Sequence, residues 1–235
     1  MGLIPLGILA GMLTTIAGLG GGILLQVALS LVVGPRVALA ITAPALLVGN
    51  LHRAVLYRAH IDRNVARAFA LGALPGSVVG GLAAVVLPAG VMHALMLGMA
   101  ALAIARHLGW WRWEPSRAVL VPAAAGIGAV SATSGGAGLL VSPLMLSTGL
   151  SGERYVSTVA VAAVAMHAGR FVAYGLGGLV NGRSLALGAA LTVAILLGNL
   201  LGARARARLS AATAPRLEVG VLCVATILAV AGVAR

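Results

Sequence analysis

The stretch Gly18-Leu19-Gly20-Gly21-Gly22 separates two apolar runs near the start of the chain, 3–18 and 22–34. Each run is shorter than the roughly 20 residues that a helix needs to cross a bilayer. Glycine allows the backbone to turn sharply and to approach other groups closely. The pattern therefore predicts a single helical hairpin that is bent or unwound at membrane depth.

A second stretch of the same kind, Ser131-Ala132-Thr133-Ser134-Gly135-Gly136-Ala137-Gly138, separates the short apolar runs 118–132 and 136–149. When the sequence is shifted by 115 residues, ten of the 25 residues from 10 to 34 are identical to their counterparts. A composition this biased gives roughly three identities by chance. The two hairpins are therefore predicted to be copies of one unit.

Two motifs further along the chain recur in the same order, with an offset that grows by a few residues, as loop insertions would produce. They are Arg53-x3-Tyr57, which returns as Arg170-x3-Tyr174, and Gly76-x3-Gly80, which returns as Gly198-x3-Gly202. We therefore expect two transmembrane repeats, residues 1–115 and 116–235.

The composition supports a membrane protein. Of the 235 residues, 61% are hydrophobic and 9% are charged, and the mean hydropathy is +1.10. A soluble domain has about 25% charged and 45–50% apolar residues, so that class is excluded. Lipid tolerates only helices or closed barrels, and no strand-like alternation is present. The predicted fold class is an all-α, polytopic helical bundle in a lipid bilayer.

The net charge of +12 comes from Arg alone, because the chain has no Lys. Most of these residues lie in short breaks between apolar runs and not on one solvated face, so nucleic acid is not expected as a partner. Twelve Arg fall on one side, including the loops 58–67 and 106–117, and four fall on the other. The positive-inside rule makes the first side cytoplasmic. Both termini are then external, and the two repeats are inverted relative to each other.

Inverted repeats with broken helices are typical of secondary transporters, in which unwound segments meet near the midplane and half-helix N-termini point at anionic substrates. Backbone N–H groups and hydroxyls at the two Gly-rich stretches are suited to an oxyanion. The alternative is that these glycines only allow close helix packing. The candidate substrate-binding residues are Thr15, Gly18, Gly20, Gly21, Gly22, Asn50, Ser131, Thr133, Ser134, Gly135, Gly136 and His167.

Asn50 and His167 are equivalent under the offset of 117 that aligns the two Arg-x3-Tyr motifs. Both lie inside long apolar runs, where a polar side chain is expensive and is a functional candidate by default. A helix–helix hydrogen bond is the competing explanation. His167 is also able to bind or release a proton near neutral pH.

Arg53 and Arg170 each lie one turn before a Tyr, near opposite membrane surfaces. We expect them to attract anions at the two mouths of a pathway, as vestibule charges. The alternative is an Arg that reaches toward the interface beside an interfacial Tyr.

All four acidic residues lie at or near breaks between apolar runs, and none lies in the middle of one. This disfavours a pump that is coupled through a membrane carboxylate and a carrier of divalent metals. No Cys/His cluster, Walker motif or hydrolase arrangement is present in the sequence. We expect no metal, no cofactor and no enzymatic activity.

A series of motifs extends over nearly the whole chain. They are Gly11-x6-Gly18-Leu-Gly-Gly-Gly-Ile, Ala40-Ile-Thr42, Asn50, Tyr57 with Ile61-Asp62, Gly72-x3-Gly76-x3-Gly80, Leu87-Pro88 and the segment from Gly126 to Gly149. Together these motifs resemble the TauE/SafE family of sulfite-exporter-like membrane proteins. The resemblance implies movement of a small anion, such as sulfite, a sulfonate or another organosulfur acid, across the bacterial inner membrane. In the second repeat, Thr133–Gly138 replaces the longer glycine run usual in the family, which leaves the substrate open.

Two other functions fit the same residues. One is an anion channel with the same fold, and the other is a membrane scaffold that assists the assembly of another complex. The sequence leaves open the direction of transport, the coupling ion and whether the chain forms a homo-oligomer.

Overall fold

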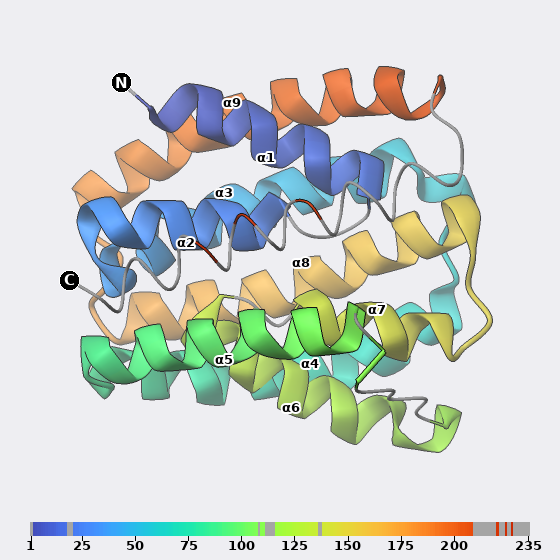
Figure 1. Cartoon of the computed structure of the whole chain (residues 1–235), viewed down its shortest axis with the longest axis horizontal. Coiled ribbons are helices and arrows are strands. Elements are labelled where there is room, and N and C mark those ends of the chain that lie inside the picture. Colours follow the sequence, from blue (N-terminus) through green and yellow to red (C-terminus); the bar gives the residue numbers. More distant parts are fainter. Residues whose placement is uncertain are drawn as a thin grey trace.

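The computed structural model describes residues 2–17, 21–107, 109–110, 116–135 and 138–208, together with Gly220, Val224 and Ile227. All regular structure in these residues is helical, which confirms the predicted all-α fold class (Figure 1). The elements are α1 (Leu3–Ala17), α2 (Gly21–Val33), α3 (Pro35–Leu56), η1 (Arg58–His60), α4 (Arg63–Val86), α5 (Ala89–His107), η2 (Arg117–Val119), α6 (Leu120–Ser134), α7 (Gly138–Leu146), α8 (Gly152–Leu176) and α9 (Gly182–Arg206).

Among the described residues, α3, α4, α8 and α9 are long enough to cross a bilayer on their own, with 22, 24, 25 and 25 residues. At 1.5 Å per residue they are about 33–38 Å long, which exceeds the roughly 30 Å of the hydrocarbon core. The segment Arg117–Ser134, which contains α6, is a fifth apolar candidate span. The chain is therefore a multi-pass helical membrane protein.

The two predicted hairpins consist of shorter helices. α1 has 15 residues and α2 has 13, which correspond to about 22 and 20 Å. They run in opposite directions (Figure 1) and approach closely at Gly21, where an added Cβ would lie 2.0 Å from the Ala10 carbonyl oxygen. α6 and α7, with 15 and 9 residues, repeat this arrangement. Residues 18–20 and 136–137 of the two breaks lie outside the described residues.

Corresponding helices of the two halves run in opposite directions. Figure 1 shows α3 and α9 running from left to right, whereas their counterparts α8 and α4 run from right to left. The contacts are exchanged in the same way: α9 packs against α1 and α3, and α4 packs against α6 and α8. Each half therefore covers the broken hairpin of the other half with its fourth helix. The repeat boundary at 115/116 stays a prediction.

Glycines form the seams between these exchanged helices. An added Cβ at Gly72, Gly76 or Gly80 of α4 would lie 2.0–2.1 Å from a carbonyl oxygen of α6. In the other half, a Cβ at Gly198 of α9 would lie 2.2 Å from the Ile8 carbonyl oxygen of α1. The repeated Gly-x3-Gly motif thus allows close helix packing, as small residues do in other membrane helices.

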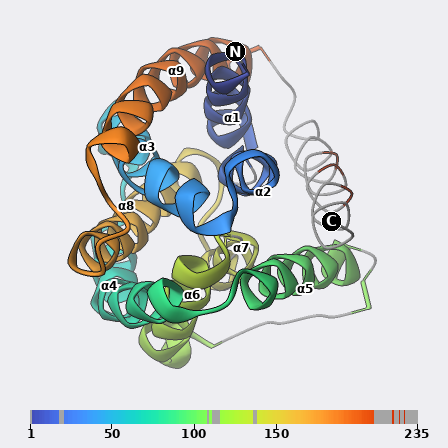
Figure 2. The same cartoon turned by 90° about the vertical axis from the view of Figure 1, so that its left-hand side faces the viewer.

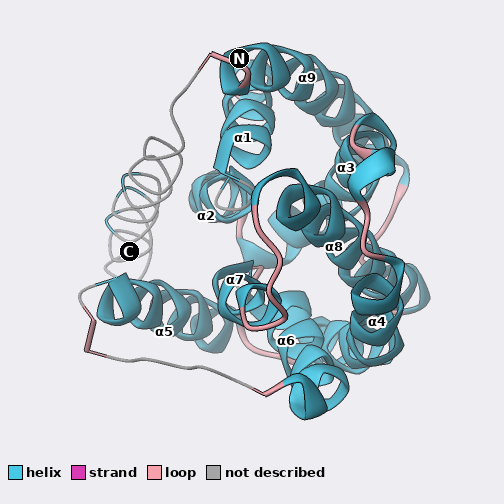
Figure 3. Cartoon of the chain, turned by 90° about the vertical axis from the view of Figure 1, so that its right-hand side faces the viewer, coloured by secondary structure: helices cyan, strands magenta, loops and turns pink. Residues whose placement is uncertain are grey.

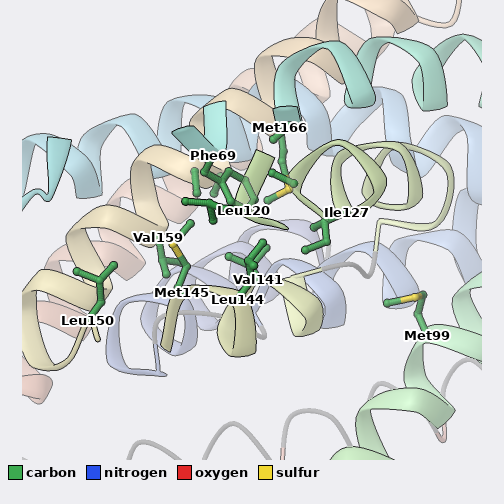
Figure 4. Packing of buried hydrophobic residues seen from close by; sticks show 14 residues of the cluster. Phe69, Met99, Leu120, Ile127, Val141, Leu144, Met145, Leu150, Val159 and Met166 are labelled. Carbon is green, nitrogen blue, oxygen red and sulfur yellow. The ribbon is translucent and has the colours of Figure 1, made fainter. Parts of the chain in front are cut away.

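Each of two apolar cores likewise combines helices of one half with the fourth helix of the other half. One lies between α4, α6, α7 and α8 (Figure 4), and the other between α1, α2, α3 and α9. Representative residues are Phe69, Leu120, Leu144 and Val159 in the first core, and Ala10, Leu25, Ile41 and Leu191 in the second.

The loop between α3 and α4 meets the start of α8 at one end of the bundle. Asp62 accepts a hydrogen bond from Arg154 at 2.7 Å, and His60 lies 3.0 Å from Glu153. The residues 58–67 and Arg154, which the Arg count assigned to one side, therefore lie together. That this side is cytoplasmic stays a prediction.

Candidate functional site

Residues beside the two breaks come into contact in the middle of the bundle. Gly135 ends α6 with φ +72°, in the left-handed region that favours glycine. An added Cβ there would lie 2.3 Å from Cγ of Gln26, which is in the second turn of α2. Figures 2 and 3, which view the bundle from its two ends, show α2 and α7 between the α1–α9 pair and the α4–α6 pair. The two hairpins thus touch through Gln26 and Gly135.

Gln26 belongs to a buried chain of polar groups that joins both halves. The Thr42 hydroxyl of α3 donates to Oε1 of Gln26 at 2.6 Å, and Nη2 of Arg170 of α8 donates to the same hydroxyl at 3.3 Å. Gln26 and Arg170 are each 1% exposed. Nε2 of Gln26 and Nε of Arg170 have no hydrogen-bond partner among the described residues. These two buried N–H donors of the polar network are therefore candidates for binding a ligand.

His167 lies on the same side of α8 as Arg170, because residues three apart share a helix face. The side chain is 8% exposed, and its Nδ1 has no partner in the part of the chain that the structure describes. The charges of Arg170 and Arg53 both act on this ring. His167 is thus placed beside the Gln26–Thr42–Arg170 chain, within the field of two cations.

The equivalent residues of the first half, Asn50 and Arg53, bond to each other and to backbone carbonyls. Oδ1 of Asn50 accepts from Nη2 of Arg53 at 2.8 Å, and Nη1 of Arg53 donates to the Thr14 carbonyl oxygen at 2.6 Å. Nδ2 of Asn50 donates to the Leu46 carbonyl oxygen at 2.7 Å. The Thr14 carbonyl is in the last turn of α1, where carbonyl groups lack an intrahelical partner and the dipole favours a cation. Arg53 therefore holds the broken end of α1.

Arg53 and Arg170 are both 1% exposed. Their guanidinium groups are therefore buried between the helices of the bundle. A role in attracting anions stays a prediction.

Thr15 binds protein and joins three helices. Its hydroxyl donates to Oδ1 of Asn199 of α9 at 3.0 Å, and Nδ2 of Asn199 donates to the Gly49 carbonyl oxygen of α3 at 2.8 Å. Asn199 was not among the predicted residues, although a polar residue inside an apolar run is the same signal that identified Asn50. Gln26 flanks the first break and Thr42 belongs to the Ala40-Ile-Thr42 motif, but neither was among the predicted substrate-binding residues.

The hydroxyls at the second break bond to their own helix. Ser134 donates to the Val130 carbonyl oxygen at 2.8 Å, and Thr133 donates to the same oxygen at 3.0 Å. The Ser131 carbonyl accepts from the Gly135 N–H at 2.8 Å, which closes the last turn of α6. Such local bonds are common for Ser and Thr near helix ends. In this conformation these groups complete the helix end.

The remaining predicted residues are glycines. Gly21 packs against α1, whereas an added Cβ at Gly22 would lie 3.5 Å from the nearest atom, in the Leu46 side chain. Gly18, Gly20 and Gly136 lie outside the described residues.

The site is electropositive. No Asp or Glu is buried in the ranges that the structure describes. A buried charge that lacks a counterion costs several kcal/mol. An anion that enters the site would offset the cost of burying Arg170.

The fold and the buried polar chain define a multi-pass helical membrane protein with a site at the contact between two broken helices. The chain matches the Sulfite exporter TauE/SafE family over residues 3–231, nearly its whole length. It therefore belongs to that family of membrane transporters, and the resemblance found in the motifs is confirmed. No curated protein and no solved structure matches the chain.

Proposed function

We propose that the protein is an ATP-independent carrier of a small anion, such as sulfite, a sulfonate or another organosulfur or organic acid, across the bacterial inner membrane. The observation that carries the proposal is the contact between Gln26 and Gly135 beside the buried Arg170. It joins the two inverted hairpins at a point with positive charge and no buried acid in the described ranges. A carrier of anions requires these properties.

The broken helices supply a second attraction for an anion. α2 begins at Gly21, which packs closely against α1, and α7 begins at Gly138, just after the second break. The first N–H groups of a helix lack intrahelical partners and carry a partial positive charge. In secondary transporters such half-helix N-termini face the anionic group of the substrate.

The proposal leaves open whether the protein forms a homo-oligomer. The lipid bilayer is the expected surrounding, because large apolar side chains such as Val79 and Val86 are exposed on the outer face of α4.

Counterflow in proteoliposomes tests the proposal. Vesicles preloaded with unlabelled sulfite should take up radioactive sulfite faster than unloaded vesicles, since a carrier exchanges substrate across the membrane. Uptake that does not depend on preloading would indicate the channel. No binding and no uptake of sulfite, methanesulfonate or acetate would contradict the proposal and favour the scaffold. Protein-free vesicles are the control.

A further inference from the structure

The two halves differ at one pair of equivalent positions on their central helices. In α3, the Asn50 amide oxygen accepts from Arg53, which is three residues later. In α8, His167 takes the place of Asn50, and the Arg170 guanidinium extends instead to Thr42 of the other half. The replacement of an amide by an imidazole thus accompanies a change in the partner of the arginine.

The contact between Arg170 and Thr42 is loose. At 3.3 Å it is longer than the 2.9–3.0 Å that is usual for N–H···O bonds. Nε of Arg170 has no partner in the described chain, nor does Nε2 of Gln26, which lies beyond the same hydroxyl. The difference from Arg53 lies in the Nη groups: those of Arg53 donate to Asn50 and to the end of α1, whereas the hydrogen bond of Arg170 within the described residues is the one to Thr42.

We propose that Arg170, Thr42 and Gln26 form the anion-binding site of the carrier, and that His167 keeps the Arg170 guanidinium available by not binding it. The Asn50–Arg53 pair is a structural clamp on α1 and binds no substrate. This inference rests on the proposed function and adds which half supplies the charge.

The chemistry of the three side chains selects an oxyanion with at least two acceptor oxygens. A guanidinium offers parallel N–H donors that fit two oxygens of one group, which a round halide cannot use. The Gln26 amide adds a neutral donor from the first half, next to the break. An oxyanion bound there would contact both inverted repeats at once, as a substrate must if its binding is to couple their movement.

Binding to the purified full-length protein in detergent tests the assignment, with sulfite and methanesulfonate as probes and chloride for comparison. Arg170→Lys keeps the charge but loses the planar donors, and we expect affinity about tenfold to hundredfold lower, as for the loss of a charged hydrogen bond. Thr42→Val should also weaken binding. Thr192→Val is the matched control, because the Thr192 hydroxyl bonds only within α9, to the Gly188 carbonyl oxygen at 2.8 Å.

Gln26→Glu provides an internal anion of nearly the same shape. Its carboxylate would lie beside Arg170, so the ligand-free protein should melt at a higher temperature than the wild type and should lose the shift caused by sulfite. The melting temperature of the ligand-free variant is measured without any substrate. It distinguishes a site that attracts an anion by charge from one in which Gln26 only fills space.

His167→Asn copies the first half. The new amide oxygen should accept from Arg170 as Asn50 accepts from Arg53, so probe affinity should fall while the melting temperature is kept or raised. Wild-type affinity in Arg170→Lys, Thr42→Val and His167→Asn would overturn the assignment and leave the carrier proposal intact. A wild type that neither binds nor transports any probe would overturn both. Should Arg170→Lys not fold, Thr42→Val and Gln26→Glu decide.

Discussion

The central helices α3 and α8 occupy equivalent places in the two halves, yet their arginines do different things. Arg53 bonds to Asn50 and to the end of α1 in its own half, whereas Arg170 bonds to Thr42 of the other half. The scaffold around them is nearly symmetric, because α9 covers α1 as α4 covers α6. The proposed division between a structural arginine and a binding arginine therefore falls at one pair of aligned positions, Asn50 and His167.

The comparison requires first that the halves be inverted. Reporter fusions at the equivalent loops after α3 and after α8, residues 57–62 and 177–181, should report opposite compartments, with the first loop cytoplasmic and both termini outside. The effect is all or none. A cytoplasmic signal from both loops would mean parallel repeats and would remove the basis of the comparison.

Large side chains at the glycine contacts between helices should destabilise both halves equally. Gly76→Leu and Gly198→Leu each add a side chain where a Cβ alone would lie 2.0 or 2.2 Å from a carbonyl oxygen. We expect a loss of about 3 kcal/mol or more, seen as loss of folded protein in detergent. Gly126→Leu, at an exposed glycine with open space around it, is the control and should fold. Loss at one seam alone would show that the halves are not packed alike.

A Gly→Ala substitution should affect transport differently at the two breaks. Gly135→Ala puts a side chain on a residue with left-handed backbone, which should lower the free energy of unfolding by about 1–2 kcal/mol. The added Cβ should also displace the Gln26 side chain. Transport should therefore fall about tenfold while most of the protein stays folded. An added Cβ at Gly22 would lie 3.5 Å from the nearest atom, so Gly22→Ala should change transport far less. Equal transport by the two variants would remove Gln26 from the site.

The helix caps offer the smallest test of symmetry. Asp62 caps α4 by accepting from Asn64 and Val65, and Asn181 caps α9 by accepting from Ser184. Replacing either residue by Ala should cost about 1 kcal/mol near neutral pH.

Only the Asp62 cap should depend on pH. The Val65 N–H, and after it Arg154, lower the pKa of Asp62. Its contribution is therefore complete above the unfolded pKa of about 3.9 and is lost as the pH falls through the lower folded value. Melting temperatures between about pH 3 and 7 should show Asp62→Asn approaching the wild type only at the acid end, while the effect of Asn181→Ala stays constant. A pH-independent difference for Asp62→Asn would contradict the charge argument.

The sequence predicted the parts of the molecule that depend on local composition. Short apolar runs around Gly18–Gly22 indicated broken helices, and the recurring Gly-x3-Gly motif indicated equivalent helices. Partner choice could not be predicted, because it depends on side chains brought together from distant segments. Thr42 and Arg170 are 128 residues apart, and nothing local shows that they touch. The hydroxyls of Thr133 and Ser134 are predicted to bind substrate, and in the structure each donates to the Val130 carbonyl oxygen of its own helix.

The affinity of sulfite for Arg170→Lys beside Arg53→Lys tests the division of roles most directly. Isothermal titration of both purified variants, with their melting temperatures, separates binding from stability. The account predicts that Arg170→Lys loses about tenfold to hundredfold in affinity and keeps its melting temperature, whereas Arg53→Lys melts earlier and binds sulfite within about twofold of the wild type. Equal losses of affinity in both variants, or a loss in Arg53→Lys alone, would contradict it.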